Sequence, residues 1–301
     1  RDVAPSRGLG DVYKRQKFMM PILIVLSVLI AVYSVTRPGA MEGVKYFLVP
    51  NVKNFSWMTV VAAMGQMFYS LSIAMGILIT FGSYMKKETS LEDSTRNVEV
   101  FDTAIAIMAG LMIIPAVFAF SGGDPDTLQA GPALMFITIP KVFENMGFGT
   151  VVGILFFLLV LFAAVTSSIA LTESAVSTFE DELGWSRRRA TVLVGVIMIA
   201  LGSLSSLGYG PLAGIKIIGM QFLDFFDFLT NSVMMPIAAM LTSLFVSRIV
   251  GMKRMEEEIM HGESTFRRKK IFIVMIKYLC PVFALIILIS SVANAFGWIA
   301  M

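Results

Sequence analysis

Long apolar stretches without charged residues recur along this chain. Several exceed the roughly 18–20 residues that a helix needs to cross the hydrocarbon core of a bilayer. The first has no charge between Phe18 and Thr36, and the fourth has none between Thr150 and Thr172. Seven candidate spans with few or no charged residues occur, at 18–36, 55–85, 99–121, 150–176, 190–208, 217–247 and 271–300. The pattern therefore predicts an all-α integral membrane protein with about seven transmembrane helices.

Composition and charge placement agree with this prediction. Apolar residues make up 56% of the chain and charged residues only 15%, whereas soluble domains carry about a quarter charged residues. Lysine and arginine are concentrated in alternate connections between the stretches, including the runs at 187–189 and 267–270. Because such an excess marks cytoplasmic loops, we expect the first helix to begin in the cytoplasm and the C-terminus to lie outside.

The first 16 residues differ in character from the rest. They are polar and basic, and they lack the apolar core that a signal peptide requires. We predict that residues 1–16 are a non-native or disordered segment, with a natural basic tail as the alternative. Residues 17–301 are predicted to form one transmembrane domain.

The stretch 55–85 is longer than one membrane span and has a polar centre. Hydroxyl groups in a membrane helix often bond to carbonyl groups of their own helix. The alternative is a discontinuous helix, unwound near 69–76. Non-helical backbone at membrane depth is tolerated where it lines a cavity or packed protein, and transporters bind substrates and ions at such breaks. The polar centre consists of Gln66, Tyr69, Ser70, Ser72 and Gly76.

A cluster of hydroxyl groups lies in the stretch 150–176. Thr166, Ser167 and Ser168 are consecutive in an otherwise apolar sequence that begins at Ala163. Neutral oxygen atoms are suitable ligands for a hard cation such as Na⁺. Small residues also serve helix packing in membranes, so both interpretations stay open.

Apart from Glu99 at the first position of 99–121, four acidic residues lie within the predicted spans. Such residues are costly in a membrane and are candidates for function, although an acid near a helix end can also reach the interface. Asp224 and Asp227 lie three residues apart on one helical face and could pair with a cation as a gate. The four residues are Asp102, Glu173, Asp224 and Asp227.

Covalent chemistry is not predicted. The chain has a single cysteine, Cys280, so that no intramolecular disulfide or cysteine-based metal site can form. Its single histidine, His261, lies in a charged loop. An intramembrane enzyme would require serine with histidine or lysine, or paired aspartates in a motif. We therefore predict that the protein is not an enzyme and has no nucleic-acid partner.

Four segments together resemble the neurotransmitter:sodium symporter family. They are GQMFYSLSIAMG at 65–76, FAAVTSSIALTE at 162–173, FEDELGWSRRRA at 179–190 and FFDFLTNS at 225–232. The resemblance extends over about residues 17–301. It implies helices five to eleven of an inverted-repeat transporter fold, with the first four helices absent. It also implies a bacterial sodium-dependent amino-acid transporter, a multi-pass protein of the inner membrane.

The resemblance implies two sodium sites. Ser70 and Asp102 would bind the sodium ion near the substrate. The carbonyl of Ala163 and the hydroxyls of Thr166 and Ser167 would form half of the second site. Since the Asp102 carboxylate would supply the negative charge that chloride provides in some relatives, no chloride requirement is expected.

The resemblance also implies a substrate site and an external gate. Tyr69 would cover the substrate, and Asp227 would be the acidic half of the gate, with 122–149 as an external lid loop. Tyr69 stands where phenylalanine is frequent, and Met75 where an aromatic residue is frequent, which leaves the size of the substrate side chain open. The implied substrate-binding residues are Tyr69, Ser70, Ser72, Met75, Ser167 and Leu171.

The function implied is sodium-coupled symport of an amino acid, or a related zwitterion or amine, by alternating access. The chain alone is expected to be inactive, because the missing first helix would supply the remaining ligands. One alternative is a proton-coupled transporter with Glu173 or Asp102 as relay. An ion channel is a weaker alternative, since the sequence contains no repeated filter motif.

Overall fold

The computed structural model describes residues 7–124, 131–144, 147–262 and 265–298. Within these ranges every regular element is a helix, apart from an isolated bridge between Ile217 and Met220. The structure thus confirms the all-α prediction.

Five helical segments in the described ranges are long and apolar enough to cross a membrane, and a bent pair makes a sixth. The bent pair is α1 (Arg7–Val35) with α2 (Ala40–Leu48). The predicted stretch 55–85 forms two shorter helices instead, α3 and α4, and neither spans a membrane alone. The five segments are α5 (Leu91–Ser121), α7 (Gly149–Leu183), α8 (Arg187–Leu207), and the composite helices Phe222–Val250 and Lys269–Ala295.

Two predicted boundaries are wrong for local reasons. The α5 helix begins at Leu91 rather than 99, because Ser90 caps it: its Oγ accepts the Asp93 amide at 2.9 Å. The sixth stretch becomes helical only at Phe222, since Ile218 and Gly219 have positive φ angles. In addition, α7 continues beyond the apolar stretch 150–176 to Leu183, and α1 begins at Arg7, before the apolar stretch 18–36. The origin of residues 1–16 stays a prediction.

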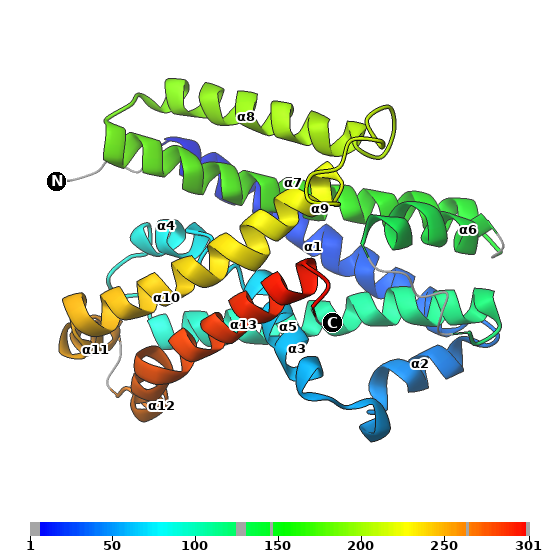
Figure 1. The fold of residues 1–301 in the computed structure, drawn as a ribbon, viewed down its shortest axis with the longest axis horizontal. Coiled ribbons are helices and arrows are strands. Elements are labelled where there is room, and N and C mark those ends of the chain that lie inside the picture. Colours follow the sequence, from blue (N-terminus) through cyan, green and yellow to red (C-terminus); the bar gives the residue numbers. More distant parts are fainter. Residues whose placement is uncertain (1–6, 125–130, 145–146, 263–264, 299–301) are drawn as a thin grey trace. The chain divides into compact units, whose positions relative to one another are not determined.

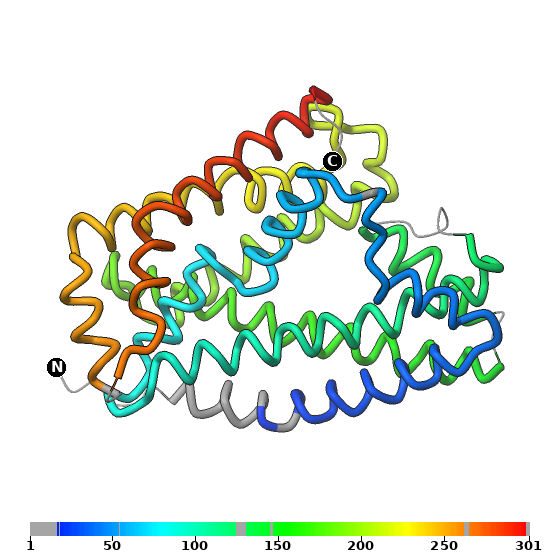
Figure 2. Tube along the Cα trace, turned by 90° about the horizontal axis from the view of Figure 1, so that it is seen from below, coloured from blue at the N-terminus to red at the C-terminus, as the bar shows by residue number. Residues whose placement is uncertain are grey.

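The chain divides into two compact units. The first consists of residues 1–54 and 100–169. There α1 and α2 meet at a bend of 115° (Figure 2). Gly39, directly before α2, has a left-handed conformation within this bend. The α2 helix was not predicted. It packs closely on α5, because a Cβ atom on Gly43 would lie 2.8 Å from Pro115 Cα.

The core of the first unit joins α1, α5, α6 (Ile139–Glu144) and the first part of α7. A π-helical turn at Leu134–Thr138 precedes α6, and both lie within the segment 122–149 that was expected to be an external lid loop. Residues 125–130 and 145–146 of that segment lie outside the described residues. The fully buried residues of this core include Ile30, Val117, Ile139, Val142 and Phe156.

The second unit consists of residues 55–99 and 170–301. Here α10 (Met235–Phe245) and α13 (Cys280–Ala295) lie side by side (Figure 1). The connection between the two composite helices contains α11 (Met252–Ile259), and α12 (Lys269–Val274) leads through a π-helical turn into α13. A core cluster links α3 to α10 and α13 through Phe68, Met235, Ala239, Ala284 and Ile287.

A side-chain hydrogen bond fastens α10 to the π-helical turn Met275–Leu279. The Cys280 amide donates to the Met275 carbonyl, and Pro281 has no N–H to donate. The Ile276 carbonyl therefore loses both possible main-chain donors. The buried Ser243 hydroxyl donates to this carbonyl from α10, which satisfies it inside the unit.

We expect Ser243→Ala to lower the free energy of unfolding by about 0.6–1.7 kcal/mol, the range for hydrogen bonds between membrane helices. The measurement is chemical unfolding in detergent. Ser247→Ala is the matched control and should change stability by less than about 0.5 kcal/mol, because Ser247 bonds only to Leu244 of its own helix. An equal loss in a Pro281→Ala background, where an N–H is restored, would contradict this explanation.

Candidate functional site

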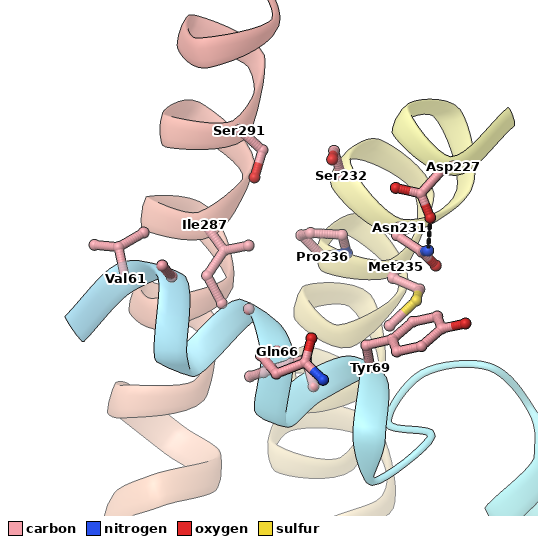
Figure 3. Close-up of a pocket in the computed structure, with 13 residues that line it drawn as sticks. Val61, Gln66, Tyr69, Asp227, Asn231, Ser232, Met235, Pro236, Ile287 and Ser291 are labelled. Atoms are coloured by element: carbon pink, nitrogen blue, oxygen red, sulfur yellow. Dashed lines mark hydrogen bonds between the residues drawn. The ribbon is translucent and has the colours of Figure 1, made fainter. Parts of the chain in front are cut away.

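The predicted discontinuous helix is present. The α3 helix (Trp57–Ser70) ends where the Leu71 amide bonds to Met67, and α4 (Ile77–Ser83) begins after Gly76. Between them Ser72 and Ala74 have φ angles of 54° and 64°. Left-handed backbone is unfavourable for residues with a Cβ atom and often marks a functional segment. The ribbon narrows to a loop just after Tyr69 (Figure 3).

The second half of the broken helix is fastened to α7. The Thr80 hydroxyl lies 3.4 Å from the hydroxyls of both Ser174 and Ser177. A Cβ atom on Gly76 would lie 2.8 Å from Ser174 Oγ, so the start of α4 contacts α7 without space for a side chain. These contacts fix one end of the break.

A cavity of about 400 Å³ lies beside α3 in the second unit. Its walls come from α3, from the helix that contains Asp227, and from α13 (Figure 3). Val61, Phe68, Met235 and Ile287 form apolar parts of the wall. The polar lining residues are Gln66, Tyr69, Asp227, Asn231, Ser232 and Ser291.

The two predicted gate residues line this same cavity. Tyr69 is half exposed on α3, and Asp227 is exposed on the facing helix. The Asn231 side-chain amide donates to Asp227 Oδ1 at 2.5 Å. The structure thus brings Tyr69 and Asp227 to one cavity, which Gln66 of α3 also lines.

The residues predicted to form the second sodium site lie on one helix of the first unit. The Thr166 hydroxyl donates to the Ala163 carbonyl at 2.9 Å, so these two oxygen atoms share one face of α7. Thr166 is buried and Ser167 is exposed. Back-bonding of this kind is what the packing interpretation also expects, and the sodium role stays a proposal.

The other predicted site residues divide between the two units. Tyr69, Ser70, Ser72, Met75 and Leu171 belong to the second unit, whereas Asp102 and Ser167 belong to the first. The sodium site of Ser70 with Asp102, and the substrate site that includes Ser167, combine residues of both units and therefore stay predictions.

Within the second unit, Met75 packs against the core cluster around Phe68 and Met235. Leu171 is exposed on α7. Among the implied substrate-binding residues of this unit, Tyr69 and Ser70 are the last two residues of α3. Ser72 and Met75 lie in the unwound segment that follows.

An ionic network around Glu173 was not predicted. The Glu173 carboxylate is only 5% exposed and accepts two bonds from Arg187, Nη1 to Oε1 at 3.2 Å and Nη2 to Oε2 at 2.5 Å. The Tyr84 hydroxyl donates to Oε1 at 3.0 Å, and Glu180 also pairs with Arg187. The charge of Glu173 is thus satisfied by a cation and a hydroxyl, and the network joins α7 to α8 and to the end of α4.

Asp224 has a partner away from the cavity. Tyr209 lies in the connection before α9 (Phe222–Asp227), and its hydroxyl donates to Asp224 Oδ1 at 3.4 Å. The pKa of Tyr209 is raised above its usual value, mainly by desolvation and secondly by the negative charge of Asp224. Tyr209 therefore stays protonated at neutral pH and remains a donor, and among the described lining residues the cavity carboxylate is Asp227.

Comparisons with known proteins agree on one family. A family model described as the sodium:neurotransmitter symporter family matches residues 12–297. An uncharacterized sodium-dependent transporter of Bacillus subtilis is 34% identical over 86% of this chain and 57% of its own length. One of Haemophilus influenzae is 32% identical over 94% of this chain and 61% of its own length.

A solved structure is also similar. MhsT, crystallised in complex with L-phenylalanine, is 36% identical, with a TM-score of 0.78, over 91% of this chain and 62% of that chain. The chain therefore spans about three-fifths of the length of these relatives.

Proposed function

Because the chain belongs to the sodium:neurotransmitter symporter family, we propose that the full product of its gene couples a sodium gradient to amino-acid uptake across the bacterial inner membrane. The observation that carries this proposal is the break between α3 and α4, which begins directly after the cavity residue Tyr69. Half-helix ends and released backbone groups are the means by which transporters bind small zwitterions. The proposal includes a cytoplasmic start and an external C-terminus.

The substrate is an amino acid or a related zwitterion. The crystal structure of MhsT with L-phenylalanine supports this class, since that protein is 36% identical. Ser70 and Ser72, at the end of α3 and in the unwound segment, would bind the polar end of the substrate. Met75 would contact its side chain, together with Leu171 and Ser167. Tyr69 and Asp227 would close the external side.

Two sodium ions would be co-transported. Ser70 and Asp102 would bind one, near the substrate, without a chloride requirement. Ala163, Thr166 and Ser167 would contribute to the other, which is supported by the oxygen atoms of Ala163 and Thr166 on one face of α7. Neutral oxygen ligands of this kind are suited to a hard cation.

Proton coupling through Glu173 receives less support. A proton relay requires a carboxylate that can accept and release a proton during the cycle. The Glu173 carboxylate is instead paired twice with Arg187 and accepts the Tyr84 hydroxyl. This pairing favours a fixed charge on α7 rather than a carboxylate that exchanges protons during the cycle.

The proposal is tested by uptake of a mixed set of labelled amino acids into proteoliposomes that contain the full gene product. At fixed pH, replacing Na⁺ with choline should abolish uptake. Ser167→Ala should raise the Na⁺ concentration for half-maximal uptake about tenfold, which corresponds to the loss of one ligand of about 1.4 kcal/mol.

The matched control is Ser205→Ala. Ser205 is a surface serine of α8 whose hydroxyl bonds to Leu201 of its own helix, so its loss should leave the Na⁺ dependence unchanged. Uptake that continues in choline would refute sodium coupling and favour a proton gradient. Normal Na⁺ dependence in Ser167→Ala would remove Ser167 from the second site.

A further inference from the structure

We propose that Asn231 is a positioning residue for transport: it holds the Asp227 carboxylate at the wall of the cavity, and the π-helical turn Phe228–Met234 sets both side chains on that wall. This inference rests on the proposed function, because it assigns Asp227 a role in substrate passage. It adds a residue and a backbone feature that the predicted gate does not contain.

The first support is the hydrogen bond itself. Asn231 Nδ2 donates to Asp227 Oδ1 at 2.5 Å (Figure 3). Among the described residues, Asn231 is the one hydrogen-bond partner of this carboxylate. Asp227 is exposed while Asn231 is half-buried, so the amide is the more enclosed of the two and can restrain the carboxylate. The Oδ2 atom keeps its capacity to accept a bond from a partner in the cavity.

The second support is the backbone between these residues. Phe228–Met234 is a π-helical turn, closed by the bond from the Met235 amide to the Thr230 carbonyl. In an α-helix, residues three and four apart share a face. Closure from i to i+5 widens the turn, so that residues four and five apart come to share a face. Asn231 and Ser232 stand four and five residues after Asp227, and all three line the cavity.

Pro236 accounts for the widened turn at this place. A proline has no N–H, so position 236 cannot donate to the Ser232 carbonyl as an α-helix requires. The preceding amide, of Met235, instead bonds five residues back. Pro236 is itself buried in the cavity wall. The proline thus accounts for the widened turn that keeps Asp227 and Asn231 on one face and brings Ser232, five residues after Asp227, to the same wall.

A double-mutant cycle tests the proposal in the full gene product. Asn231→Ala should lower the initial rate of uptake at subsaturating substrate about tenfold, as expected for loss of a hydrogen bond to a charged group. In the Asp227→Ala background the same change should alter the rate by less than twofold, because the acceptor of its hydrogen bond is already gone. Asn231→Leu, which keeps the shape without the donor, repeats the cycle if the alanine variant does not fold.

Thr230→Ala is the matched control. Thr230 lies in the same turn and outside the cavity lining, and its hydroxyl donates to main-chain carbonyls of its own helix, at 2.7 Å to Phe226 and 3.4 Å to Asp227, without contact to the Asp227 carboxylate. This variant should stay within twofold of the parent. Equal losses from Asn231→Ala with and without Asp227 would overturn the proposal, since Asn231 would then act through helix structure alone.

The same cycle measured on the thermal unfolding midpoint needs no transport. It separates this inference from the proposed function: coupling between the two residues should appear even where uptake proves independent of sodium. Coupling in unfolding with no coupling in uptake would refute the role in transport. Absence of coupling in both measurements would refute the interaction.

Discussion

Replacing Arg187 with glutamine is expected to destabilise the protein by about 3–5 kcal/mol, the cost of leaving a buried charge without its partner. The Glu173 side chain is only 6% exposed and would retain only the Tyr84 hydroxyl. The reverse change, Glu173→Gln, should cost less, since the Arg187 side chain is 36% exposed and keeps Glu180. Chemical unfolding of the purified protein in detergent measures each difference.

Arg188→Gln is the matched control for this prediction. Arg188 is the next residue of α8, it is exposed, and it forms no ion pair with a described residue. Its replacement should change stability by less than about 0.5 kcal/mol. The double variant Glu173→Gln with Arg187→Gln should recover much of the loss, because neither charge is then left alone. Equal effects of the two arginine variants would contradict the buried network.

Much of the fold follows from the sequence because membrane helices leave a strong signal. Every predicted stretch contains a helix in the structure, since an apolar segment in lipid must satisfy its own backbone. The break after Ser70 was predictable too, because five polar or small residues cluster where one helix would be too long. The Ser90 cap that sets the start of α5 and the positive φ angles that precede α9 carry no apolar signal, and those boundaries were missed.

The partners of individual side chains were harder to predict from the sequence. Arg187 is one of three consecutive arginines that indicate only a cytoplasmic connection, and nothing in the sequence distinguishes it as the partner of Glu173. Asn231 was likewise missed, although a signal existed: Pro236 and Pro281 each follow a π-helical turn by two residues. A proline within a predicted span therefore indicates a released carbonyl and a widened turn nearby, and polar residues just before it merit examination.

Gly76→Ala is expected to destabilise the protein by about 2 kcal/mol and to reduce uptake. The φ angle of Gly76 is 79°, and a left-handed conformation costs a residue with a Cβ atom about 1–2 kcal/mol. The new Cβ would also lie 2.8 Å from Ser174 Oγ, an atom whose hydroxyl is within 3.4 Å of Thr80. Moving Ser174 aside would therefore disturb the contact that fastens α4 to α7.

Two neighbouring substitutions should act in the opposite direction. Ala74→Gly removes the strain of a φ angle of 64° and should stabilise by up to about 1 kcal/mol. Gly82→Ala lies within α4, where a Cβ meets no atom within 4 Å, and should stabilise by about 0.5–1 kcal/mol. Unfolding in detergent measures all three variants. If Gly76→Ala is tolerated as well as Gly82→Ala, the left-handed conformation at the break is not required, and α4 can begin without the close contact to Ser174.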